Sequence, residues 1–427
     1  MADLTLNLAG IRSPNPFWLA SAPPTDSLAK VSRAFEAGWG GVVWKTLGLD
    51  PPVINVNGPR YGAWHGPQRT VLGFNNIELI SDRPLADNLR EIAAIKRLWP
   101  DRAMVVSVML PLEPAVWPAV LRRIEDSGAD GIELNLGCPH GMSERGMGSA
   151  VGQNPDLVAT ATACAKAATA LPVLVKLTPN VTDITQGALA AHLAGADGLA
   201  LINTINSIMA VDLDTMAPMP TVGGAGSHGG YCGPAVKPIA LHMVAEAARC
   251  CPLPLSAIGG IASWRDAAEF LALGATGLQV CTAAMVFGLR IIDGLVAGLS
   301  DWMDSAGYAN LAALRGKALP QVVPWNRLDL NHVAKARIIQ DHCIGCGRCW
   351  LSCEDTSHQA ISHRQGTYAI EEENCIGCAL CQLVCPVPGA IVMERLTTGH
   401  DPRTETAISN EYLPWQEHPH NPARSKT

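Results

Sequence analysis

The chain has 427 residues, of which 48% are hydrophobic and 16% charged, and its formal net charge is −7. This composition can build a large core, and the absence of a basic run argues against nucleic-acid binding. The N-terminus has no positive region followed by an apolar stretch, and prolines interrupt the most apolar long segment, 103–121. We therefore expect a soluble cytoplasmic protein with neither a signal peptide nor a membrane helix.

From residue 17 to about residue 299, short segments rich in Val, Ile and Leu alternate with longer amphipathic ones. The short segments are typical of parallel strands that are buried on both faces. The predicted strands are 17–20, 41–45, 104–109, 131–135, 173–177, 198–203, 255–258 and 277–281. The predicted helices are 27–37, 85–98, 115–127, 155–170, 183–194, 235–249, 264–273 and 285–302. Glycines follow several of them where a left-handed cap is expected, at Gly38, Gly128, Gly195 and Gly274.

Eight strand–helix alternations predict an α/β fold, an eight-stranded β/α (TIM) barrel. The alternative, an open doubly wound sheet, would need a Gly-x-Gly-x-x-Gly turn after the first strand, and residues 20–24 do not supply one. Two long loops, 49–81 and 206–231, follow the second and sixth strands, on the side where barrel active sites are built. The predicted domains are a barrel at 1–303, a linker at 304–335, a small domain at 336–395 and an extended tail at 396–427.

Polar side chains gather where the predicted strands end. The fourth strand ends at Asn135 and enters a glycine-containing loop that carries Cys138 and His140. A lone cysteine is more often a small buried residue, but these polar neighbours favour a reaction site at the barrel rim. Lys45 and Lys176 lie inside apolar strands, which is costly unless each meets an anion or acceptor. The edge of a reduced flavin is the predicted acceptor, and a lysine that merely snorkels is the alternative.

Two further strand ends suit a phosphate. The seventh strand ends at Gly259 and Gly260, and the eighth ends at Cys281 and Thr282. Both offer backbone N–H groups ahead of a helix, and the two glycines permit close approach of a ligand to the backbone. Because barrels often bind phosphate with the loops after these two strands, this pattern supports a flavin phosphate site.

Eight of the 14 cysteines lie between residues 343 and 385, in two C-x2-C-x2-C-x3-C runs. This is the bacterial two-cluster ferredoxin spacing, in which the last cysteine of each run binds the other cluster. A pair of zinc sites is the alternative, but zinc favours separated cysteine pairs. Glu354 replaces the proline expected after the first run. The predicted ligands are Cys343, Cys346, Cys349 and Cys385 for one [4Fe–4S] cluster, and Cys375, Cys378, Cys381 and Cys353 for the other.

Several phrases together resemble the dihydropyrimidine dehydrogenase family, whose barrel is similar to the wider dihydroorotate dehydrogenase-like group. They are Gly73-Phe-Asn-Asn-Ile-Glu78, Asn135-Leu-Gly-Cys-Pro-His-Gly-Met142, Glu144-Arg-Gly-Met-Gly148, Lys176-Leu-Thr-Pro-Asn180, Asn203-Thr204 and both cysteine runs. The likeness spans residues 3–395 and matches the FMN barrel and ferredoxin portion of the family, as in the catalytic subunits of its bacterial NAD-dependent members. It implies reduction of the 5,6 double bond of uracil or thymine, with hydride from FMN and a proton from Cys138.

The resemblance also implies the binding residues. The pyrimidine would be held by Asn76, Glu78, Asn135, Asn203 and Thr204. FMN would be held by Ala20, Ser21, Lys45, Asn135, Lys176, Gly233, Gly259, Gly260, Cys281 and Thr282. Gly137 stands where the animal enzyme has serine, and we expect it to loosen the Cys138 loop.

The animal enzyme has a further half that binds FAD and NADPH, and this sequence carries no such dinucleotide fingerprint. We therefore expect a separate FAD- and NAD(P)H-binding subunit around a homodimer core. A dihydroorotate dehydrogenase that exchanges electrons with a ferredoxin-like partner is the alternative, but it needs a cation for the orotate carboxylate, and Glu78 disfavours an anion there. A third reading is an electron carrier with a silent barrel, against which Cys138 and its polar neighbours argue.

Overall fold

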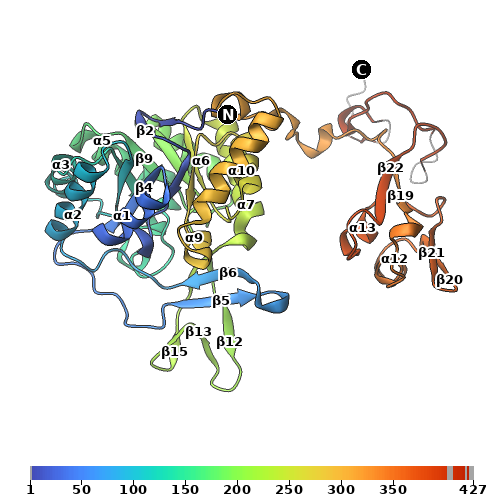
Figure 1. The fold of residues 1–427 in the computed structure, drawn as a ribbon, viewed down its shortest axis with the longest axis horizontal. Coiled ribbons are helices and arrows are strands. Elements are labelled where there is room, and N and C mark those ends of the chain that lie inside the picture. The colour runs from blue at the N-terminus through green and yellow to red at the C-terminus, as the bar shows by residue number, and fades with distance from the viewer. Residues whose placement is uncertain (1, 402–406, 419–420, 423–427) are drawn as a thin grey trace. The chain divides into compact units, whose positions relative to one another are not determined.

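The computed structural model describes residues 2–401, 407–418 and 421–422 (Figure 1). It consists of two compact units, Met1–Pro320 and Gln321–Thr427. The division falls inside the segment 304–335, which the sequence suggested as a linker. Within the described residues, no helix combines the length and apolar character needed to cross a membrane.

A closed barrel of eight parallel strands forms the first unit, in the order β10-β17-β18-β3-β4-β7-β8-β9. Chain neighbours are therefore barrel neighbours, and the predicted β/α barrel is confirmed. Almost every residue of these strands is buried, because helices cover the outside and side chains fill the inside. The strands are β3 (Phe17–Leu19), β4 (Gly41–Leu47), β7 (Ala103–Val108), β8 (Gly131–Asn135), β9 (Val173–Lys176), β10 (Gly198–Leu201), β17 (Leu255–Ile258) and β18 (Gly277–Val280).

The helices of this unit follow the predicted pattern with one exception. The helix predicted at 285–302 is wrong, because Gly288 takes a φ of +83° and separates α9 from α10. The four predicted cap glycines all have positive φ, as left-handed caps require. The helices are α1 (Leu28–Ala37), α2 (Leu85–Leu98), α3 (Val116–Asp126), α4 (Ser149–Gly152), α5 (Pro155–Ala168), α6 (Ile184–Leu193), α7 (Lys237–Cys250), α8 (Trp264–Ala272), α9 (Thr282–Phe287), α10 (Ile291–Ser305) and α11 (Leu311–Leu314).

An N-terminal hairpin, β1 (Leu6–Leu8) and β2 (Ile11–Ser13), seals one end of the barrel. A side chain on Gly131, the first residue of β8, would collide with Ile11, and one on Gly277, the first residue of β18, would press on Leu6. The hairpin therefore packs beneath the amino ends of the strands. The carboxyl ends are left to face the long loops, where the site is expected.

The two long loops, predicted only as irregular insertions, pair with each other in one antiparallel sheet of order β11-β16-β6-β5. The first loop contributes β5 (Tyr61–His65) and β6 (Val71–Asn76), and the second contributes β11 (Ile205–Ser207) and β16 (Gly229–Cys232). Figure 1 shows further hairpin strands of the second loop projecting beyond β5 and β6. These are β12 (Ala210–Asp212), β13 (Ala217–Met219), β14 (Thr221–Val222) and β15 (Ala225–Gly226).

The second unit is small and built around its cysteines, several of which are buried with Ala336, Ile338, Ile361 and Ile391. Strand β19 pairs with β22, and β20 pairs with β21. Its elements are β19 (Ala334–Ile338), α12 (Arg348–Thr356), β20 (Ile361–Arg364), β21 (Thr367–Ile370), α13 (Leu380–Val384) and β22 (Ile391–Arg395). Of the predicted tail, Leu413 accepts a backbone hydrogen bond from Leu330 at 2.9 Å, whereas 402–406, 419–420 and 423–427 lie outside the described residues.

Short 3₁₀ helices complete the chain at the loop entrances and in the segment between the two units. They are Pro23–Thr25, Pro67–Arg69, Ser143–Arg145, Pro234–Val236, Leu319–Gln321, Trp325–Arg327, Gln340–His342 and Trp415–Glu417.

Candidate active site

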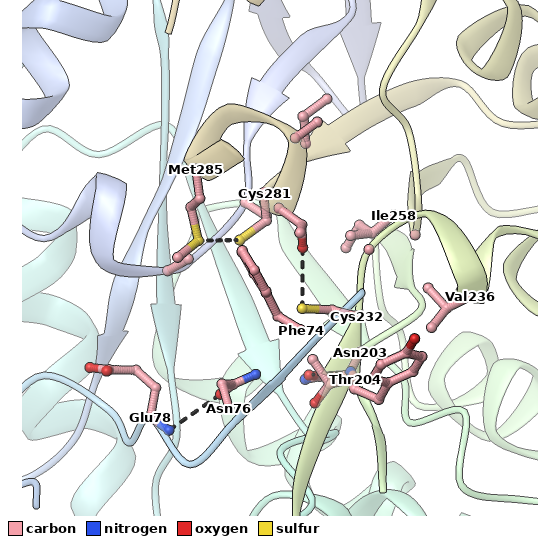
Figure 2. Close-up of a pocket in the computed structure, with 18 of the residues that line it drawn as sticks. Phe74, Asn76, Glu78, Asn203, Thr204, Cys232, Val236, Ile258, Cys281 and Met285 are labelled. Carbon is pink, nitrogen blue, oxygen red and sulfur yellow. Dashed lines mark hydrogen bonds between the residues drawn. The ribbon is translucent and has the colours of Figure 1, made fainter. Parts of the chain in front are cut away.

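A cavity of about 500 Å³ lies at the carboxyl ends of the barrel strands, and residues of the sheet β11-β16-β6-β5 also line it (Figure 2). This volume is within the range of about 300–1,000 Å³ that is usual for small-molecule sites. Every residue predicted for catalysis, substrate binding or flavin binding lines this one cavity. These residues are Ala20, Ser21, Lys45, Asn76, Glu78, Asn135, Cys138, Lys176, Asn203, Thr204, Gly233, Gly259, Gly260, Cys281 and Thr282.

Asn135, at the end of β8, is the centre of an amide network. Its Nδ2 donates to Thr46 Oγ1 at 3.0 Å, and its Oδ1 accepts from Asn203 Nδ2 at 2.8 Å. Asn203 Oδ1 in turn accepts the backbone N–H of Thr204 at 2.8 Å. From the sheet of the two long loops, Asn76 Nδ2 donates to Gly230 O at 2.8 Å. The amides are therefore held in fixed orientations, so each can present a defined donor or acceptor to a ligand.

Cys138 sits in the loop after β8 with its thiol at the cavity wall. Burial raises the pKa of this thiol to about 11, although a hydrogen bond to the His140 carbonyl opposes the shift. The thiol is therefore protonated at neutral pH and has a proton to donate. Backbone contacts fix the loop, since Ser149 N donates to Cys138 O at 3.0 Å. A side chain on Gly137 would collide with Asn203, and the expectation that this glycine loosens the loop stays a prediction.

His140 ties this loop to the segment that carries Glu78. Its Nε2 lies 2.9 Å from the Glu78 carbonyl oxygen, and a carbonyl can only accept, so Nε2 carries the hydrogen. Burial lowers the pKa of His140, so the ring is neutral. Its Nδ1 is then a buried acceptor that has no hydrogen-bond partner within the described residues.

Glu78 is the centre of a charged cluster at the cavity wall. Its carboxylate meets Lys45 Nζ at 2.5 Å and Arg60 at 3.3 Å, and its side chain is 9% exposed. Asn55 Nδ2 donates to it at 3.0 Å. Tyr61 also donates, and burial together with the negative charge of Glu78 raises the pKa of the Tyr61 phenol. The carboxylate therefore neutralises cations that would otherwise face the cavity.

Lys176, at the end of β9, forms a second buried ion pair, 3.3 Å from Glu133 Oε1. Glu133 is fully buried and also accepts from Gln279 Nε2 at 2.7 Å. Gln279 Nε2 lies 3.1 Å from Ser256 Oγ as well. Gln279 lines the cavity, and its Oε1 is buried without a hydrogen-bond partner among the described residues. A ligand with an N–H or O–H group in the cavity would satisfy this acceptor.

Three glycines with positive φ, Gly233, Gly259 and Gly260, also line the cavity. A Cβ on Gly260 would lie 3.0 Å from Gly233 O, and one on Gly233 would lie 2.9 Å from Gly73 Cα. This backbone surface is therefore open only because side chains are absent. Nearby, Thr282 Oγ1 donates to Cys232 Sγ at 3.1 Å (Figure 2).

The sequence reading missed several of these residues. Thr46, Asn55, Arg60 and Gln279 all contact predicted site residues. Thr46 directly follows one predicted strand and Gln279 lies within another, so their position was a usable signal. Asn55 and Arg60 lie in a long loop, and their approach to Glu78 depends on how that loop folds.

In the second unit, the cysteines form two quartets around separate small cavities. Cys343, Cys346, Cys349 and Cys385 line one, and Cys353, Cys375, Cys378 and Cys381 line the other. Each quartet thus takes its fourth thiol from the other run. The backbone N–H of Ala360 donates to Cys353 Sγ at 3.3 Å. Across the described residues, no three His, Cys, Asp or Glu side chains are placed to hold a single metal ion.

Comparison with known families matches residues 4–303 to dihydroorotate dehydrogenase and residues 336–393 to a 4Fe–4S dicluster domain. The chain is 41% identical over 369 residues to the NAD-dependent dihydropyrimidine dehydrogenase subunit PreA of Escherichia coli, covering 86% of this chain and 89% of that protein. It is 41% identical over 329 residues to the chloroplastic dihydropyrimidine dehydrogenase (NADP(+)) of Arabidopsis thaliana, covering 74% and 77%.

The chain is also 34% identical over 335 residues to the catalytic subunit of dihydroorotate dehydrogenase B (NAD(+)) of Thermococcus kodakarensis, covering 75% of this chain and 99% of that one. Among solved structures, DHODH from Eimeria tenella in complex with ferulenol superposes with a TM-score of 0.61 at 17% identity, over 75% of this chain and 89% of that chain. At this identity the structural likeness supports the fold alone.

Proposed function

Because the chain belongs to the dihydroorotate dehydrogenase family, and shares 41% identity with PreA, we propose that it is the catalytic subunit of a dihydropyrimidine dehydrogenase. Its reaction is reduction of the 5,6 double bond of uracil or thymine. The observation that carries this proposal is the convergence of a protonated thiol, Cys138, with the oriented amides of Asn76, Asn135 and Asn203 on one cavity. The amides can read the donor and acceptor edge of a pyrimidine, and the thiol can supply its proton.

The charges around the cavity favour a neutral pyrimidine. A dihydroorotate dehydrogenase is the second candidate, supported by the Thermococcus kodakarensis relative. Orotate carries a carboxylate that needs a cation, and Lys45, which lines the cavity, and Arg60 both pair with Glu78. An orotate carboxylate would have to compete with the Glu78 carboxylate for them. Uracil has no such charge to place.

The residues of the cavity fit a flavin, and we propose FMN. The orphaned Gln279 Oε1 accepts from an N–H or O–H group, and the surface at Gly233, Gly259 and Gly260 allows a phosphate to approach the backbone. Lys45 and Lys176, 8% and 6% exposed, place N–H donors along the same cavity. The bound flavin would supply the hydride, and the iron–sulfur clusters would supply electrons one at a time.

Cys138 performs the proton transfer in this proposal. Its thiol donates a proton to the ring carbon that does not receive hydride, so the double bond gains one hydride and one proton in total. The raised pKa keeps the donor protonated between turnovers, with water restoring the proton. Asn135 and Asn203 hold the ring in register with the thiol, and Gly137 allows Asn203 to pack against the loop.

The second unit would hold two [4Fe–4S] clusters, one in each cysteine quartet. The name of the PreA relative describes a subunit, and this supports a separate FAD- and NAD(P)H-binding partner that reduces the clusters. We propose a homodimer as the core of that assembly. The sequence has no dinucleotide fingerprint after its first strand, so nicotinamide oxidation is assigned to the partner.

The test uses the purified full chain. With dithionite-reduced viologen as donor it should reduce uracil and thymine, and it should turn over orotate much more slowly. NADH alone should give no turnover until a flavoprotein partner is added. One FMN and about eight iron atoms per chain are expected from two such clusters. Preferential turnover of orotate would replace the proposal with the dihydroorotate dehydrogenase, and robust NADH oxidation by the isolated chain would refute the need for a partner.

A further inference from the structure

Lys335 is a buried lysine in the ferredoxin-like unit, within a segment that the sequence suggested as a linker. It lies in β19 and is 5% exposed. Its ammonium donates to the backbone carbonyl of Glu372 at 2.5 Å and to that of Cys375. Both partners are uncharged, and no ion pair of Lys335 occurs within the described residues. A buried ammonium without a carboxylate needs another source of negative charge.

That negative charge is available from the cysteine quartet beside it. Cys375, whose carbonyl Lys335 contacts, is one of the four thiols around the second cavity. Strand β19 passes close to this group, because a side chain on Gly377, between Cys375 and Cys378, would collide with Ala334 O. A cluster held by four thiolates is anionic overall, and it gains a further negative charge when it is reduced.

Among the described residues, the other quartet has no buried cation at the equivalent position. The two cysteine runs begin at Cys343 and Cys375, and Lys335 and Thr367 each stand eight residues before the start of a run. The structure follows the same repeat, since the nearest neighbour of a side chain built on Gly345 would be Gly366 O at 3.7 Å, as Ala334 O is for Gly377. Thr367, the counterpart of Lys335, is exposed and uncharged.

Other charges in this unit differ from Lys335 in exposure. Arg337, on the same strand, is exposed and pairs with Glu394 at 2.9 Å. Arg348 is exposed near the first quartet, where water and salt screen its charge. His358 lines the second cavity but is also exposed. Among the described residues of the second unit, no lysine or arginine other than Lys335 is buried.

We infer that Lys335 tunes the cluster held by Cys353, Cys375, Cys378 and Cys381, favouring its reduced state and raising its reduction potential. The inference rests on the proposed pair of clusters. Reduction adds one electron and one negative charge, and a fixed cation in a weakly screened environment stabilises that charge. The twin cluster lacks this stabilisation, so the two clusters are inequivalent. Electrons that enter the unit would then rest preferentially on the cluster beside Lys335.

The experiment is a reductive titration of the full-length protein, followed by electron paramagnetic resonance of the reduced clusters. Lys335→Gln removes the charge and keeps a donor, whereas Lys335→Arg keeps the charge. Arg337→Gln is the matched control on the same strand. We expect one of the two midpoint potentials to fall in Lys335→Gln, with the other unchanged, and neither to fall in Lys335→Arg or Arg337→Gln.

The iron count separates the possible failures. If wild-type protein lacks about eight irons, the proposed clusters themselves are refuted. If the irons are present and Lys335→Gln leaves both potentials unchanged, or shifts them no more than Arg337→Gln does, only the role of Lys335 is refuted. If Lys335→Gln does not retain its clusters, the wild-type protein decides: two clusters with different midpoint potentials support the tuning, and two equal midpoint potentials overturn it.

Discussion

Replacing Glu78 by glutamine should shift the enzyme from neutral towards anionic pyrimidines. The Glu78 carboxylate is 2.5 Å from Lys45 and 3.3 Å from Arg60, with its side chain 9% exposed. It cancels positive charge at the cavity wall and repels a substrate carboxylate. Glutamine keeps the size and part of the hydrogen bonding but removes the charge. Lys45, which lines the cavity, then becomes available to an anion there.

The size of the shift follows from two terms. Two unit charges 4 Å apart interact by about 4 kcal/mol at an effective dielectric constant near 20, and we halve this to about 2 kcal/mol because solvent reaches the cavity. That gain for orotate corresponds to a factor of about 30. Uracil loses a hydrogen bond to a charged group, worth about 1.5–3 kcal/mol. The ratio of kcat/KM for orotate over uracil should therefore rise by at least about 10²-fold.

The assay measures both substrates with reduced viologen as donor, in wild type and in Glu78→Gln. Glu144→Gln is the matched control, because Glu144 is exposed and lies outside the residues that line the cavity. Flavin content is measured in each preparation, so that a lost cofactor is not mistaken for a changed preference. An unchanged ratio in flavin-loaded Glu78→Gln would refute the electrostatic argument, since it would mean that Lys45 and Arg60 do not act on the substrate.

Three further predictions concern the loop after β8. Cys138→Ala should retain flavin and clusters, but its rate of uracil reduction should fall by about 10²-fold or more, as expected for a missing general acid. Near-normal turnover would mean that the thiol only packs against its neighbours. Burial raises the Cys138 pKa to about 11, so the rate of uracil reduction should fall only as the pH approaches that value. The reverse reaction, oxidation of dihydrouracil, needs the thiolate, and its rate should rise about tenfold per pH unit below that pKa. A transition near an ordinary thiol pKa in either rate would contradict this. Gly137→Ser should destabilise the protein by about 1–3 kcal/mol in thermal unfolding through its collision with Asn203, and an unchanged melting temperature would refute that packing.

The barrel could be predicted because its signals are local. Its strands are short and almost wholly buried, so each reads as an apolar run without needing a known partner. Glycines such as Gly128 and Gly195 mark helix ends because their positive φ disfavours other residues. The helix over 285–302 failed for the same kind of reason, since Gly288 acts as a break that apolar periodicity conceals.

The cavity lining followed from the barrel, because the carboxyl ends of parallel strands meet at one rim whatever their separation along the chain. The sheet over that rim did not follow. It pairs Asn76 with Gly230, far away in sequence, and a stretch with Gly229 and Gly230 reads as a loop. Those glycines serve close packing instead: a side chain on Gly230 would collide with Thr204. The close contacts that require these glycines exist only once the two loops have paired with each other.

For the two strand lysines, the sequence predicted the need for a partner but not which partner they have. A lysine in a buried strand requires an anion, and that requirement is correct for both Lys45 and Lys176. The sequence suggested the flavin as the acceptor and a snorkelling lysine as the alternative, yet each lysine has a protein carboxylate, Glu78 for Lys45 and Glu133 for Lys176. Glu78 lies on a loop and Glu133 on a neighbouring strand, so neither pairing has a local signal. Because each of these two lysines is already paired with a carboxylate, both can offer N–H donors to a ligand while their charge is offset, which is the environment that an uncharged pyrimidine needs.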